Sequence, residues 1–156
     1  MIKGQTSRVK GQSLFEVVVA LAIITLILVA IVALGTLSIR NISFSRNQTL
    51  ATRLAQTTVE WLRGERDEDW SVFRDRAAQA PTPSLPWCLT SLEWPTTPRR
   101  CGASEDVAGT IFSREVYFPG SLDVNAIHAE VVISWVDAQG FHEAKSSTFF
   151  TNWRTN

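Results

Sequence analysis

The feature that most constrains this chain is an unbroken apolar run near its N-terminus. Residues 17–39 (VVVALAIITLILVAIVALGTLSI) form 23 consecutive positions without an ionisable side chain. As a helix, a run of 23 residues is about 34 Å long, which matches the roughly 30 Å hydrocarbon core of a bilayer. The sequence therefore predicts a helix that is long enough to cross a membrane.

The rest of the chain has an ordinary soluble composition. All six Trp residues lie beyond residue 60, so the 156 residues divide into an apolar segment and one domain. The 15 basic and 15 acidic side chains balance, and this net charge gives no indication of a nucleic-acid partner. The first ten residues carry Lys3, Arg8 and Lys10 and form a short basic leader.

The segment after residue 39 is more polar but still favours a helix, because residues 40–70 contain no proline. Apolar side chains at helical spacing form one stripe, which consists of Leu50, Leu54 and Trp61, flanked by Ala51, Ala55, Val59 and Leu62. We predict one helix from about Ser13 to about Arg63, apolar on every face over residues 12–39 and amphipathic over residues 40–63. Gly64 is a plausible stop, and a short second helix is expected before Pro81.

Residues 64–156 are expected to form a globular domain. The segment 81–109 contains five prolines and both cysteines, which is typical of an irregular loop region. Residues 110–118, 128–136 and 141–153 are rich in β-branched and aromatic side chains and predict an antiparallel sheet over about 110–152. The middle strand carries apolar residues on both faces, so it is expected to be central. The fold class is therefore α+β, with the helix stripe packed on the sheet.

Cys88 and Cys101 could be bridged. A disulfide that closes a loop of this size stabilises the folded state by on the order of 3 kcal/mol. Such a bond persists in an oxidising compartment. The alternative is a pair of unrelated buried thiols. The sequence has no C-x-x-C pair, so a redox or zinc site is not expected.

Other candidate sites have weaker support. His128 and His142 flank the hairpin turn at 137–140 and could lie near each other, but no third metal ligand accompanies them, and two exposed strand histidines are the simpler interpretation. The acidic run 65–69 lacks the spacing of a calcium loop and predicts a solvated turn. Arg99 and Arg100 are too few to indicate nucleic-acid binding. No catalytic motif is present, so we expect no enzyme activity, cofactor or metal.

Glu16 distinguishes between interpretations of the apolar run. A secretory signal has an apolar region of about 7–15 residues, which is shorter than the 23 residues present here. A plain membrane anchor explains the length but gains nothing from a carboxylate, which is costly in the hydrocarbon core. The third interpretation is a helix that leaves the membrane after processing.

The residues around Glu16 resemble a known signal. Gly11 followed by QSLFEVVVALAI, after a basic leader, is similar to the class III signal of type IV prepilins and of the related pseudopilins of type II secretion. The resemblance implies that a prepilin peptidase removes residues 1–11 by cleavage between Gly11 and Gln12. It also implies that the new N-terminal residue, Gln12, is N-methylated and that Glu16 becomes the fifth residue. The sequence departs from the family pattern at two positions. Gln12 stands where Phe or Met is commoner, and Phe15 stands where a smaller aliphatic residue is usual.

The chemistry of this arrangement follows from the cleavage. The new α-ammonium group would lie about 6 Å from Glu16 along the helix axis, where a first-turn glutamate also favours the macrodipole. In an apolar filament core the two charges can offset each other's desolvation, within one chain or between neighbours. One buried charge pair also limits how apolar helices can slide along each other.

The resemblance implies a pilin-like fold and a structural role. The expected function is a minor pilin-like subunit of a type IV pilus, with a pseudopilin of a type II secretion-like system as the alternative. A single-pass anchored ectodomain that binds or senses a ligand is the competing class. The implied partners are other pilin or pseudopilin subunits, the prepilin peptidase, an inner-membrane assembly platform, and membrane lipid before assembly. The implied location is the inner membrane, with the C-terminal domain outside the cytoplasm, and then a periplasmic or extracellular filament.

Overall fold

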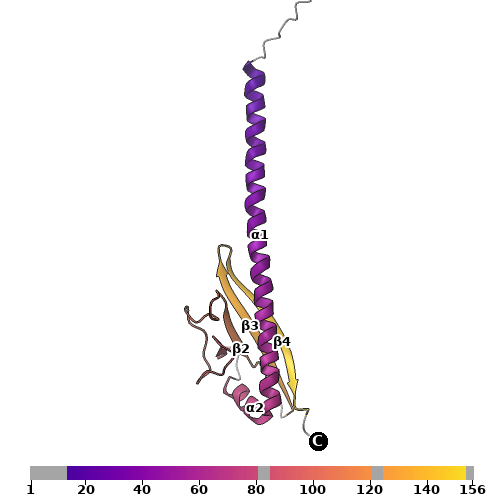
Figure 1. Ribbon diagram of the computed structural model, residues 1–156, viewed down its shortest axis with the longest axis vertical. Helices are drawn as coiled ribbons and strands as arrows, with labels where there is room; N and C mark the ends of the chain where they lie inside the picture. The colour runs from indigo at the N-terminus through magenta and orange to yellow at the C-terminus, as the bar shows by residue number, and fades with distance from the viewer. Residues whose placement is uncertain (1–13, 81–84, 121–124, 154–156) are drawn as a thin grey trace, which may run out of the picture. The chain divides into compact units, whose positions relative to one another are not determined.

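A computed structural model describes residues 14–80, 85–120 and 125–153. The chain divides into two compact units, residues 1–44 and 45–156, which are described separately. The elements in chain order are α1 (Leu14–Glu68), α2 (Trp70–Gln79), β1 (Trp87–Cys88), β2 (Ser113–Tyr117), β3 (Ala126–Asp137) and β4 (Gly140–Thr151) (Figure 1). The α+β class expected from the sequence is confirmed, with a long N-terminal helix and a small antiparallel sheet as in a pilin-like fold.

The described part of the first unit is a bare helix. Every side chain from Leu14 to Phe44 is exposed, including Leu14 at 82% and Phe15 at 74%. By length and composition α1 could cross a membrane, and its most apolar stretch has no residue buried within the protein. This confirms the predicted apolar helix and shows that nothing in the described chain covers it.

In the second unit the same helix packs on the sheet through one buried face. Its buried positions are Ala51, Ala55, Thr58, Val59 and Leu62. This buried face differs from the predicted stripe. Leu50 is exposed, and Leu54 and Trp61 are only partly buried against the core. The two alanines, together with Thr58, Val59 and Leu62, form the buried face of α1 in place of the larger residues of the predicted stripe.

Gly64 does not end the helix, contrary to the sequence prediction. α1 continues to Glu68, and apart from the adjoining residues and helix backbone no atom lies within 4 Å of the place where a Gly64 side chain would begin. A glycine inside a helix costs only about 1 kcal/mol, which the surrounding structure tolerates. The break falls at Asp69, whose carboxylate accepts hydrogen bonds from the backbone amides of Ser71 (2.8 Å) and Val72 (3.1 Å) and caps α2. The predicted second helix is confirmed.

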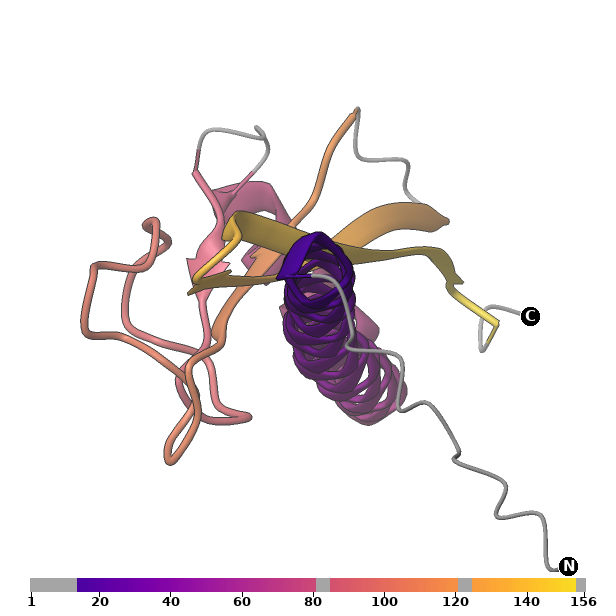
Figure 2. The ribbon, with the colours of Figure 1, turned by 90° about the horizontal axis from the view of Figure 1, so that it is seen from above.

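The four strands form one antiparallel sheet in the order β1-β2-β3-β4. β3 lies between β2 and β4, as its apolar residues on both faces predicted. β3 and β4 pair from Ala126 opposite Thr151 to Asp137 opposite Gly140, and Gly140 takes a φ of 120° at the turn. The sequence missed β1, where Trp87 pairs with Val116 inside the proline-rich segment. Figure 2 shows the connection from β1 to β2 as a long excursion to one side of the sheet.

The core lies between this sheet, the second half of α1 and α2. Phe73 of α2 meets Phe118 and Phe150 edge-on, with ring centroids 5.9 and 5.3 Å apart. Trp87 is fully buried and its indole N–H donates to the carbonyl of Arg76. These contacts hold α2 and the start of the loop region against the sheet.

Candidate functional site

The predicted processing site and its glutamate are only partly within the described chain. Gly11, Gln12 and the leader 1–11 lie outside the described residues. Glu16 lies in the first turn of α1, two residues after its start at Leu14, and its side chain is exposed. A carboxylate at this position favours the positive end of the helix dipole.

The surface that surrounds Glu16 is apolar on all sides. Leu21, Leu26 and Leu34 are 57, 71 and 67% exposed and point to different sides of the helix. Thr25 and Thr36 each bond their hydroxyl to a carbonyl three residues earlier, so their polar atoms are satisfied within the helix. Such a surface is stable only against lipid or against other apolar helices.

The predicted disulfide is present. Cys88 and Cys101 are joined by an S–S bond of 2.03 Å, which ties β1 to the loop region. The backbone N–H of Cys101 also donates to Glu115 on β2 at 2.8 Å. The irregular segment is therefore fixed to the sheet by β1 and, at Cys101, by the bridge and by the bond to Glu115.

An ion pair and a hydrogen bond also stabilise this loop. Arg99 forms an ion pair with Glu105, and the backbone N–H of Gly102 donates to that carboxylate at 2.7 Å. The hydrogen bonds from Arg99 and from the Gly102 amide lower the pKa of Glu105 to about 2. Arg99 is thus engaged within the chain and does not form a free basic tip with Arg100.

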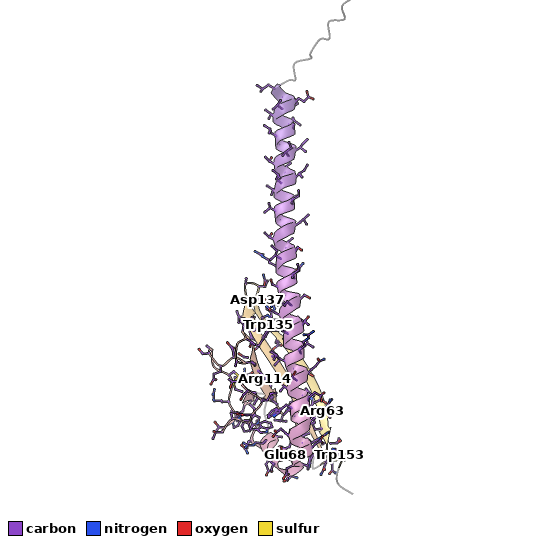
Figure 3. All side chains as sticks on the ribbon, viewed as in Figure 1. Arg63, Glu68, Arg114, Trp135, Asp137 and Trp153 are labelled. Carbon is purple, nitrogen blue, oxygen red and sulfur yellow. A yellow bond between two sulfur atoms is a disulfide. The ribbon has the colours of Figure 1, made fainter. Side chains whose placement is uncertain are left out.

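Arg114 is the main feature that the sequence did not reveal. Its side chain is buried on the helix-facing side of the sheet, where its Nε donates to the carbonyl of Leu89 at 2.9 Å. Its Nη1 lies 3.4 Å from the hydroxyl of Thr58 on α1. Figure 3 labels Arg114 among the side chains of the second unit. Burial lowers the pKa of Arg114. One side chain therefore links β2 to both α1 and the loop region.

The two histidines do not come together. His128 stands opposite Phe149, stacks on its ring at 4.5 Å and bonds Ser147 through Nε2 at 2.7 Å. His142 stands opposite Trp135 near the hairpin turn and bonds Asp137 at 2.9 Å. Burial raises the pKa of Asp137, but the hydrogen bonds from the Gln139 amide and from His142 outweigh it and lower that pKa overall.

The acidic run at the end of α1 is more structured than the predicted solvated turn. The Trp94 indole donates to Glu65 at 2.6 Å, and the Trp153 indole donates to Asp67 at 2.9 Å. A cavity of about 460 Å³ opens here, lined by Glu65, Glu68, Asp69, Val72, Arg76 and Trp94. Within the described ranges, no three His, Cys, Asp or Glu side chains are grouped so that they could hold a metal ion.

Comparison with protein-family models, curated proteins and solved structures gives no match.

Proposed function

We propose that this protein is a filament subunit of the type IV pilus class, minor pilin-like, which is inserted in the membrane as a prepilin, processed, and then assembled through α1. The observation that carries the proposal is the 31-residue stretch of α1 from Leu14 to Phe44, on which every side chain is exposed. This stretch begins within the Gly11–Glu16 signal. Lipid covers this surface before assembly, and the helices of neighbouring subunits cover it afterwards.

The two-stage use of α1 explains its composition. A permanent membrane anchor would be more stable in lipid without Glu16. A helix that moves from lipid into a filament core benefits from a carboxylate that pairs with an ammonium group, because the pair sets the axial position of an otherwise featureless apolar helix. Cleavage after Gly11 supplies that ammonium group.

The second unit supports the same role in a different way. Its disulfide and its loop contacts rigidify a domain that would stand outside the cytoplasm.

The test compares filaments that contain this subunit or its Glu16→Ala variant. We expect membrane insertion and loss of residues 1–11 to be unchanged, while the amount of the variant in sheared, purified filaments falls strongly. Thr25→Ala is the matched control, since Thr25 is an exposed polar residue of the same segment whose hydroxyl bonds only its own helix. Normal incorporation of Glu16→Ala would show that the carboxylate has no role in assembly.

A further inference from the structure

The exposed side of α1 within the second unit carries positive charge without a partner. Arg46 and Arg53 are exposed and lie seven residues apart, so they share one side of the helix at about 10 Å spacing along its axis. The segment 40–59 contains no acidic residue. In the described part of the chain neither guanidinium has an ion-pair partner.

The threonine hydroxyls near these arginines already have acceptors within the helix. The hydroxyls of Thr49, Thr52 and Thr57 bond the helix carbonyls four residues earlier, at 2.8, 2.9 and 2.9 Å. The guanidinium groups of Arg46 and Arg53 are therefore, among the described residues, charges without a partner on this side of the helix. We call it the arginine face, defined by Arg46 and Arg53.

Glu60 lies seven residues after Arg53 on the same side but is paired with Arg63, so the unpaired negative charge lies at the far end of the same helix. The cavity beside Glu68 is lined by three carboxylates and by one guanidinium, that of Arg76. The Arg76 guanidinium is held 5.6 Å over the Trp87 ring. Glu65 and Asp69 already accept bonds within the chain, whereas Glu68 is exposed and has no hydrogen-bond or ion-pair partner among the described residues.

The lining of this cavity suits a guanidinium group. Trp94 lines it with an aromatic ring, on which a planar guanidinium can stack. Glu68 offers a free carboxylate, which accepts two parallel bonds from arginine in a way that a lysine ammonium cannot reproduce. A cationic side chain is favoured over a metal ion, because the described carboxylates are not grouped as metal ligands.

We propose that this cavity receives an arginine from the arginine face of a second copy of the chain. The inference rests on the proposed function, in which copies enter one membrane in the same direction and an antiparallel pair is excluded. Copies at the same height would place Arg46 beside Arg46, which is repulsive. A copy displaced along the axis by about 22 Å brings Arg53 to the level of Glu68, and one displaced by about 33 Å brings Arg46 there.

Such a contact has a structural consequence. It joins two different surfaces of the same chain, so it is heterologous and can repeat along a filament instead of closing into a dimer. It also requires that at least two copies of this chain are neighbours in the filament, which goes beyond the proposed function.

The first test reverses the charges in the full-length chain. Arg53→Glu, Arg46→Glu and Glu68→Arg are each expected to lower the copies per filament by about tenfold, as for loss of a charge-assisted contact. Combining Glu68→Arg with one of the two arginine reversals should restore incorporation, and the arginine that restores it gives the axial displacement. Arg74→Glu and Asp75→Arg are matched controls, since both residues lie outside the cavity lining and the arginine face.

The second test measures proximity. Chains with Glu68→Cys and either Arg53→Cys or Arg46→Cys should form a ladder of cross-linked species in filaments, while Asp75→Cys in place of Glu68→Cys should not. If the wild-type chain enters filaments but neither combination restores incorporation and no ladder forms, this inference is overturned alone. If the wild-type chain is absent from filaments, the proposed function fails as well.

Discussion

The buried guanidinium of Arg114 allows a quantitative test of how the second unit is held together. Arg114 is 3% exposed, and its two side-chain contacts are with the Leu89 carbonyl and the Thr58 hydroxyl. No carboxylate among the described residues pairs with it. It therefore carries a desolvation cost that only neutral acceptors offset.

The expected magnitudes follow from these contacts. Arg114→Ala leaves the buried Leu89 carbonyl without its side-chain donor, at about 1–3 kcal/mol, and opens a cavity, so we expect a total loss of about 2–5 kcal/mol. Arg114→Met leaves the same carbonyl unpaired and, like Arg114→Ala, removes the buried charge, but it fills most of the volume and so avoids most of the cavity. Arg114→Met should therefore be clearly more stable than Arg114→Ala and within about 2 kcal/mol of the wild type.

The assay is urea unfolding of the full-length chain in detergent, followed by tryptophan fluorescence, because Trp87 and Trp94 lie in or against the core. Thr58→Val provides a further comparison, since it removes only the weaker contact at 3.4 Å, and it should cost at most about 1 kcal/mol. An Arg114→Ala variant that loses less than about 1 kcal/mol would refute the reasoning, because no large truncation at a packed site should be so mild.

The remaining predictions concern the loops. Replacing both cysteines by serine should lower the free energy of unfolding by about 3 kcal/mol in the same assay, and an unchanged midpoint would contradict the assigned bridge. Gly140→Ala should destabilise by more than about 1 kcal/mol because its φ is 120°, whereas the control Gly64→Ala should stabilise by about 0.5–1 kcal/mol, since it lies in open space within α1. The lowered pKa of Glu105 means that its contribution is present above its usual pKa and is lost as the pH falls from about 4.5 toward about 2. Hydrogen-exchange protection of the Gly102 amide should fall over that range, and constant protection would contradict the contact.

Local patterns in the sequence predicted most of the fold. The apolar run predicted the first half of α1. The β-branched segments on either side of a glycine turn predicted β3 and β4. Prediction failed at the end of α1, where Gly64 favoured a stop. The break falls several residues later, at Asp69, whose carboxylate caps α2.

Only part of the candidate site could be predicted from the sequence. Glu16 and the cysteine pair stood out because a charge among apolar residues and an isolated pair of thiols are visible in a single sequence. The buried position of Arg114 was not visible, since its neighbours in sequence form an ordinary alternating strand and its acceptors are 25 and 56 residues away. The cavity beside Glu68 likewise depends on Trp94, which reaches Glu65 across 29 residues.

The central claim is that α1 is an anchor only until the chain is processed and assembled. The most direct test is the intact mass of the protein recovered from sheared filaments of cells with an active prepilin peptidase. We predict a chain that begins at Gln12, with one added methyl group at its N-terminus. Recovery of the chain only in the membrane fraction, with residues 1–11 still attached, would contradict the account.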